Sequence, residues 1–189
     1  MARIPYINKE EATPEVAEFF AKMESHGASV LNLWKMAAHS PVTLKHMVRL
    51  GNSILSRTQL DPKLREIVIL RVAEVLDCAY ERKAHTVLGR EVGMTDEQVA
   101  SVRDWEGSDV FSAAERAALR YTDEVTRNGK ASRSAFSEMG KHLSHKEMME
   151  LTITAGFYGM LARLLLTFEV DPEGDNLKSS SQITGRSSG

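Results

Sequence analysis

The sequence predicts an all-α protein, and three observations support this. Three of its five prolines directly follow a helix-capping residue, at Thr13-Pro14, Ser40-Pro41 and Asp61-Pro62. Proline is favoured at the first position of a helix because its missing N–H has no partner there, and Ser, Thr and Asp cap that turn. Three capping boxes follow further along the chain. The alternation of polar and apolar residues that is typical of a strand is not evident anywhere.

These signals place a compact bundle of about eight helices. The cap–proline pairs begin the helices expected at 14–25, 41–57 and 62–76. The capping boxes, each a Ser or Thr followed three residues later by Glu or Gln, begin those at 96–104, 113–128 and 145–169. Two more are expected at 78–92 and 132–142. No proline lies between Pro62 and Pro172, so long helices are unobstructed there.

Length and composition are those of one globular domain, which we expect over residues 1–170. Residues 171–189 are polar and rich in Ser and Gly, so a flexible tail is expected there. The net charge of −2 without a basic stripe predicts no nucleic-acid partner. No apolar run reaches the roughly 18 residues of a membrane span, so no membrane partner is expected. The first residues lack the apolar region of a signal peptide, and we therefore expect a cytoplasmic protein.

Cys78 is the only cysteine. One cysteine excludes a disulfide, a Cys-x-x-Cys redox pair and a thiolate zinc cluster within a single chain. The two histidines that lie close together, His142 and His145, are separated by the Ser144 cap and cannot share a helix face. The sequence therefore predicts no metal and no cofactor.

Two of the expected helices are apolar on nearly every face. One is 62–76, and the other is the segment 151–168, where Arg163 is the only charged residue. A helix that is apolar all round is normally buried. Two such helices exceed what a monomer of this size readily covers, so we predict a homo-oligomer that is at least a dimer.

Glu66 is the unexpected residue in the helix 62–76. A buried carboxylate without a partner is costly, which makes Glu66 a candidate for a proton relay. The alternative is an ordinary buried salt bridge with a basic residue of another helix. Lys63 can reach Glu66 from one turn before it, whereas Arg71 points elsewhere and is expected to pair with Glu74.

A second polar group follows in the helix 78–92. Cys78, Glu81 and His85 lie three and four residues apart, which places them on one face, at the edge of a packed helix. Glu81 and His85 can share a proton or hold the imidazole in one tautomer, as general acid–base catalysis requires. The alternatives are a surface Glu–His pair and a core cysteine. The other side, expected to face the core, carries Tyr80, Ala84, Val87 and Leu88.

The run from Leu64 to Ala73, followed by Cys78-Ala79-Tyr80-Glu81 and His85, resembles the carboxymuconolactone decarboxylase family. That all-helical family includes the alkyl-hydroperoxidase D proteins. Ala38-His39-Ser40-Pro41 and the segment 156–164 extend the resemblance over roughly residues 4–170.

The resemblance implies a site made of Glu66, Cys78, Glu81 and His85, with Tyr80 assigned to substrate binding. In the hydroperoxidase branch a second, peroxidatic cysteine stands where this chain has Glu81, so dithiol chemistry cannot close within the chain. The decarboxylase branch implies acid–base chemistry on a small carboxylated or lactone-type substrate. The family also assembles as trimers or hexamers, and the same is expected here.

Three functions follow from these residues. The leading hypothesis is a small-molecule enzyme that uses Glu81 and His85 as acid and base, with Glu66 tuning or relaying the proton, to decarboxylate or isomerise a keto acid or lactone. The second is a single-thiol hydroperoxide reductase that uses Cys78 and an external thiol. The third is a non-catalytic oligomeric binding protein, whose signature would be a collapsed pocket with a salt-bridged Glu66 and a solvated His85.

Overall fold

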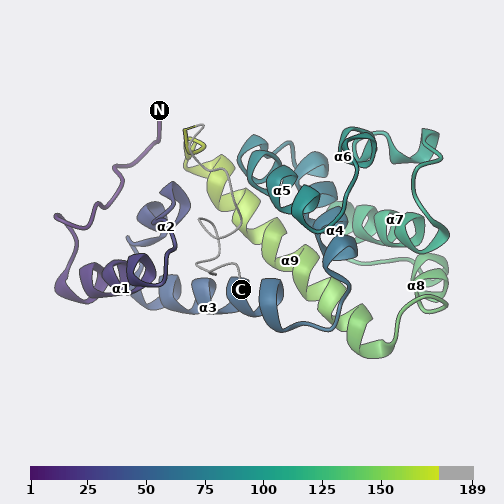
Figure 1. Ribbon diagram of the computed structural model, residues 1–189, viewed down its shortest axis with the longest axis horizontal. Helices are drawn as coiled ribbons and strands as arrows, with labels where there is room; N and C mark the ends of the chain where they lie inside the picture. Colours follow the sequence, from purple (N-terminus) through teal and green to yellow (C-terminus); the bar gives the residue numbers. More distant parts are fainter. Residues whose placement is uncertain (175–189) are drawn as a thin grey trace. The chain divides into compact units, whose positions relative to one another are not determined.

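The computed structural model describes residues 1–174, and within them the chain forms nine α-helices, one short 3₁₀ helix and no strand. The all-α prediction is confirmed. Figure 1 shows the elements in chain order. They are α1 (Pro14–Ser25), α2 (Asn32–Ala37), α3 (Pro41–Arg57), α4 (Pro62–Val75), α5 (Ala79–Glu91), α6 (Asp96–Ser101), η1 (Trp105–Gly107), α7 (Ala113–Asn128), α8 (Arg133–Met139) and α9 (His145–Thr167).

The chain divides into two compact units. One comprises residues 1–56 together with the chain from Leu164 onward, and the other comprises 57–163. The expectation of one domain over 1–170 stays a prediction. The expected tail at 171–189 lies, from residue 175, outside the described residues.

The first unit contains α1, α2, α3 and the end of α9. Its core is a cluster of apolar residues from the first three helices, Val16, Phe20, Ala38, Leu44 and Val48. The chain before α1 is held to the end of α9, because the amide of Arg3 donates to the Phe168 carbonyl at 2.9 Å and its guanidinium pairs with Glu169 at 2.8 Å. The helix α2 was not predicted. It is six residues long, and its N-cap residue, Leu31, supplies no capping side chain, so the sequence carries no start signal for it.

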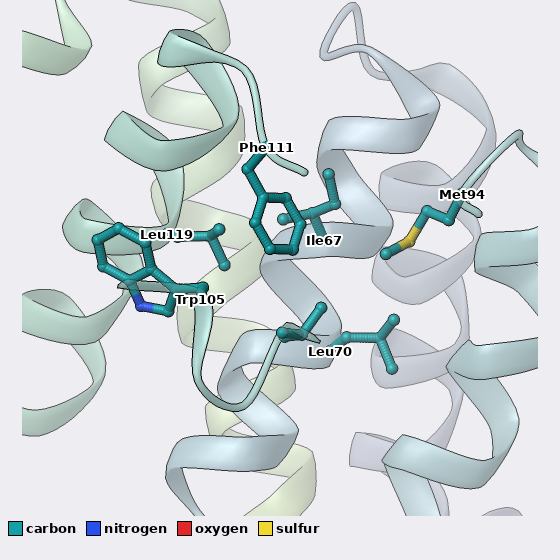
Figure 2. Packing of buried hydrophobic residues seen from close by; sticks show 7 residues of the cluster. Ile67, Leu70, Met94, Trp105, Phe111 and Leu119 are labelled. Carbon is teal, nitrogen blue, oxygen red and sulfur yellow. The ribbon is translucent and has the colours of Figure 1, made fainter. Parts of the chain in front are cut away.

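The second unit is built around α4. This helix packs against α5 on one side and α7 on another (Figure 1). Every residue from Leu64 to Ala73 is buried, which confirms that α4 is apolar and enclosed on all faces. Figure 2 shows the side chains that pack on it from α7 and the connecting segments. The cluster is Ile67, Leu70, Met94, Val102, Trp105, Phe111 and Leu119.

Arg71 joins α4 to α7. Its guanidinium pairs with both oxygens of Asp123, at 2.7 and 3.0 Å, and donates to the carbonyls of Val102 and Arg103 at the end of α6. The indole N–H of Trp105 donates to the same carboxylate at 3.0 Å. The expected pair between Arg71 and Glu74 was therefore wrong.

Glu74 and Lys63 pair elsewhere. Glu74 lies one turn after Arg71 but contacts Arg82 at 2.8 Å and Arg103 at 3.0 Å. Lys63 does not reach Glu66; its ammonium group pairs with Glu115 of α7 at 3.0 Å. Arg71, Glu74 and Lys63 all take partners distant in the sequence, which helix spacing alone does not reveal.

Most predicted helix starts are confirmed. Asp61 accepts a hydrogen bond from the Leu64 amide at 2.8 Å, and the capping boxes at Thr95 and Ser112 are both formed. The helix ends were less accurate. The helices predicted at 96–104 and 132–142 end at Ser101 and Met139.

The helix α9 is long and apolar enough to cross a membrane by length and composition alone. Half of its most apolar window is buried inside the protein, and a core helix of a soluble protein passes the same test. Leu151, Ala155, Phe157 and Tyr158 are among its buried residues. In this protein α9 is a packed helix.

Candidate active site

Glu66 lies in the middle of the buried helix α4 and is fully enclosed. One carboxylate oxygen, Oε1, accepts a hydrogen bond from Arg65 Nε at 3.1 Å, and the other, Oε2, lies 2.6 Å from His85 Nδ1. A buried carboxylate is stable only when it is paired and hydrogen-bonded, and these two contacts meet that requirement. Glu66 is thus linked to α5 through His85.

The turn between α4 and α5 places the rest of the group. Asp77 adopts a left-handed backbone conformation with φ of 52°, and the next residue, Cys78, occupies the N-cap position of α5. The amide of Cys78 donates to the Ala73 carbonyl at 2.8 Å, which fixes the start of α5 against the end of α4. Glu81 in the first turn and His85 in the second therefore come to lie beside Glu66.

His85 connects the two carboxylates. Its Nδ1 contacts Glu66, and its Nε2 lies 3.4 Å from Glu81 Oε2. The imidazole ring of His85 packs edge-to-face on the ring of Tyr158 in α9. The ring centroids are 4.8 Å apart, and the ring planes are at 86° to each other. The residues Glu66, Glu81 and His85 are each at most 4% exposed. The arrangement is a buried chain of carboxylate, imidazole and carboxylate.

The two carboxylates control the charge of the imidazole. Burial lowers the pKa of His85, but the charges and hydrogen bonds of Glu66 and Glu81 outweigh it and raise that pKa from 6.5 to about 9. His85 is therefore an imidazolium at neutral pH, with a proton on each ring nitrogen.

Glu81 has one oxygen that the protein leaves unused. Its Oε2 faces His85, whereas its Oε1 is buried and has no hydrogen-bond partner. Buried polar atoms without partners are rare in folded proteins and call for an explanation. Here the unused atom is a carboxylate oxygen that can take up or deliver a proton.

Cys78 lies at the beginning of the same helix and is buried. Burial raises the pKa of its thiol, the Glu81 charge raises it further, and hydrogen bonds from the Glu81 and Tyr80 amides only partly lower it. The thiol is therefore kept in its protonated, weakly nucleophilic form.

The structure brings the predicted residues Glu66, Glu81 and His85 together and places Cys78 at the N-terminus of the same helix. Tyr80 is buried in the first turn of α5. The expectation that the polar face lies at the edge of a packed helix was wrong, because Glu81 and His85 are enclosed by α4 and α9. Their catalytic roles, and that of Tyr80 in substrate binding, stay predictions.

Two residues of the site were missed. Arg65 pairs with the neighbouring carboxylate of Glu66, a contact between adjacent residues that helix-face reasoning does not consider. Tyr158 lies in the segment 151–168, whose composition predicts an apolar, packed helix and gives no sign of a contact with His85. Across the described part of the chain, no group of three His, Cys, Asp or Glu side chains is placed to hold a metal ion.

Comparisons with known proteins agree with this geometry. Residues 41–124, which contain Glu66, Cys78, Glu81 and His85, match the sequence profile of the carboxymuconolactone decarboxylase family. The uncharacterized protein YnjA of Escherichia coli K12 is 25% identical over 119 residues, covering 62% of this chain. The match spans 65% of YnjA, less than two thirds of its length.

Solved structures share the fold. An uncharacterized peroxidase-related protein from Ralstonia eutropha JMP134, described as an alkylhydroperoxidase AhpD core, superposes with a TM-score of 0.79 at 16% identity, over 92% of this chain and 93% of its own. A cysteine-to-alanine variant of the debrominase Bmp8, in complex with 2,3,4-tribromopyrrole, gives 0.75 at 17% identity, over 92% and 95%. At such identities the likeness establishes the all-helical, AhpD-like fold alone. The cytoplasmic location stays a prediction.

Proposed function

We propose that the chain, whose residues 41–124 match the family model of the carboxymuconolactone decarboxylases, is a small-molecule enzyme that transfers protons through Glu81 and His85. The single observation that carries the proposal is the buried Glu66–His85–Glu81 chain, which ends in an unpaired carboxylate oxygen. An unpaired carboxylate oxygen at the end of this chain is available to a ligand.

Each residue has a separate role in this proposal. Glu66 holds Nδ1 of His85 and stabilises the imidazolium, so it is a positioning residue. Nε2 of His85 lies 3.4 Å from Oε2 of Glu81 and holds that side chain in place. Oε1 of Glu81 accepts a proton from substrate carbon or returns it to carbon. Decarboxylation or isomerisation of a keto acid or lactone is the reaction class we propose.

Proton exchange at carbon provides a direct test. The protein is incubated in D₂O with a β-keto acid such as acetoacetate, or with α-angelica lactone, and loss of the α-proton signal and product formation are followed by ¹H NMR. Glu81→Gln and His85→Asn should each slow the reaction by about 10²-fold or more. Glu138→Gln, on the exposed face of α8, is the control and should react at the wild-type rate. Wild-type rates in both site variants would overturn the proposal.

A second candidate is the single-thiol reduction of hydroperoxides by Cys78. It is favoured by the placement of Cys78 at the N-terminus of α5, where two backbone amides face the sulfur. The thiolate would attack the peroxide O–O bond and release the alcohol, and two external thiols would then reduce the sulfenate to thiol and water. Burial and the raised pKa of the thiol make this the weaker candidate. Intact mass after one equivalent of peroxide tests it through the addition of one oxygen.

We also propose that the protein is a homo-oligomer, a trimer or hexamer by resemblance to the family. Exposed apolar side chains follow one another along a single stripe of α9, at Met149, Ile153 and Met160. Such a stripe on a helix is typical of a surface that a second subunit covers.

A further inference from the structure

The aromatic ring of Tyr158 packs directly on the His85 ring. It lies on α9, and its ring is held between His85 and Phe157, both in edge-to-face contact, with centroid distances of 4.8 and 5.4 Å. The residue is 4% exposed. Two perpendicular ring contacts and this burial leave the phenol little freedom to move.

Tyr158 also lies in the electrostatic field of the site. Burial raises its pKa well above 10, the negative charges of Glu66 and Glu81 raise it further, and Arg65 lowers it in part. The phenol consequently stays protonated at any physiological pH. It is a hydrogen-bond donor next to the imidazole that carries the proton chain.

The hydroxyl of Tyr158 is a donor that the protein leaves unused. Within the described part of the chain, it makes no hydrogen bond with another residue. The Oε1 atom of Glu81, whose other oxygen contacts Nε2 of His85, is an unused acceptor. One open donor and one open acceptor therefore belong to residues that contact the same ring. Together they match a ligand that has a hydrogen-bond acceptor for Tyr158 and an acidic proton for Glu81.

We propose that Tyr158 contacts the substrate and donates a hydrogen bond to its carbonyl oxygen, while Glu81 Oε1 exchanges the proton on the adjacent carbon. The substrate class is then an enolisable carbonyl compound, such as a ketone, ester or lactone. This inference rests on the proposed function and adds to it the residue that stabilises the developing negative charge.

The proposed reaction conserves protons and electrons. The C–H bond next to the carbonyl breaks, its proton goes to Glu81 Oε1, and its electron pair moves onto the carbonyl oxygen to form an enolate. The O–H of Tyr158 stabilises that oxygen without losing its proton. Glu81 then returns the proton to the same or a conjugated carbon, so the substrate is exchanged or isomerised and no other reactant is consumed.

Tyr158→Phe is the decisive variant, because it keeps the ring against His85 and removes only the hydroxyl. The isomerisation of α-angelica lactone should lose about 10²-fold in kcat with little change in KM, since the hydrogen bond strengthens in the transition state. Tyr121→Phe is the matched control. Tyr121 is a buried tyrosine of α7 whose hydroxyl is already bonded to Thr152 Oγ1 at 2.9 Å, so its removal should leave kcat unchanged.

A binding measurement distinguishes failure of the proposed Tyr158 contact from failure of the proposed function. The lactone labelled with ¹³C at the carbonyl should show a saturable downfield shift with wild-type protein, with Tyr121→Phe and with Glu81→Gln, but not with Tyr158→Phe. If the wild type gives no shift, or Tyr158→Phe gives the same shift, the role of Tyr158 is overturned. If Glu81→Gln and His85→Asn retain wild-type exchange rates, the proposed function itself fails.

Discussion

Arg71 and Asp123 form a two-point ion pair between α4 and α7, with Nε to Oδ1 at 2.7 Å and Nη2 to Oδ2 at 3.0 Å. Both side chains are largely buried. Removing one partner leaves the other as an uncompensated charge in the protein interior, so Asp123→Ala should lower the free energy of unfolding by about 3 kcal/mol or more. Urea unfolding followed by circular dichroism measures the effect. Glu138→Ala breaks an exposed, solvent-screened pair with Lys141 and should lower the free energy of unfolding far less. Equal losses in both variants would contradict the prediction.

Stability should fall as pH rises from about 6.5 to about 9. Because the carboxylates raise the pKa of His85 in the folded protein from 6.5 to about 9, folding favours its protonated form. This contribution is complete below pH 6.5 and is lost as pH rises through 9, and it amounts to about 3 kcal/mol. The raised pKa values of Cys78 and Tyr158 also lower the free energy of unfolding as pH rises, mainly above pH 9. The measurement is therefore made below pH 9, where the slope comes from His85. The variant His85→Gln should lose the slope in this window. A variant with the wild-type slope would show that His85 is not its source.

The thiol of Cys78 should be protected from reagents in the native state. It is buried and its pKa is raised, so iodoacetamide at about pH 8 should label it at least about tenfold more slowly than the denatured protein. A variant that combines Cys78→Ser with Ser137→Cys, at an exposed site on α8, controls for reagent activity. Rapid native labelling of Cys78 would favour the thiol-based candidate function.

A charge in the apolar stripe of α9 should separate the subunits. Ile153 is 42% exposed and lies between Met149 and Met160, so Ile153→Asp should convert the assembly to monomers without unfolding it. Light scattering on a size-exclusion column measures the mass. Phe136→Asp, at an exposed apolar residue of α8, is the control and should leave the mass unchanged. A folded wild-type monomer at micromolar concentration would contradict the predicted oligomer.

Much of the fold could be predicted because its start signals are local. Three helices are capped by a side chain that accepts a hydrogen bond from the amide three residues later, at Asp61, Thr95 and Ser112. Each of these signals lies within a few consecutive residues. The helix α2 has no such signal, and its existence depends on packing Leu33 and Met36 into the protein. Helix ends were less predictable because the terminal turns are set by contacts elsewhere.

The candidate site could be predicted only in part. Spacing along one helix indicated that Glu81 and His85 are neighbours, and composition singled out Glu66. The contact between Glu66 and His85 joins two helices across 19 residues, and Tyr158 reaches the same ring from α9, so neither follows from periodicity. The burial of the pair depends on these same contacts. The charges that determine the protonation of His85 therefore become visible only in three dimensions.

The enclosure of α4 from Leu64 to Ala73 also determines how the molecule opens. Amide hydrogens in a helix covered on all faces exchange with solvent only when the whole cooperative unit unfolds. Those of Ile67 to Leu70 should therefore be among the slowest to exchange, and Glu66, which directly precedes them, should keep its place until the unit unfolds.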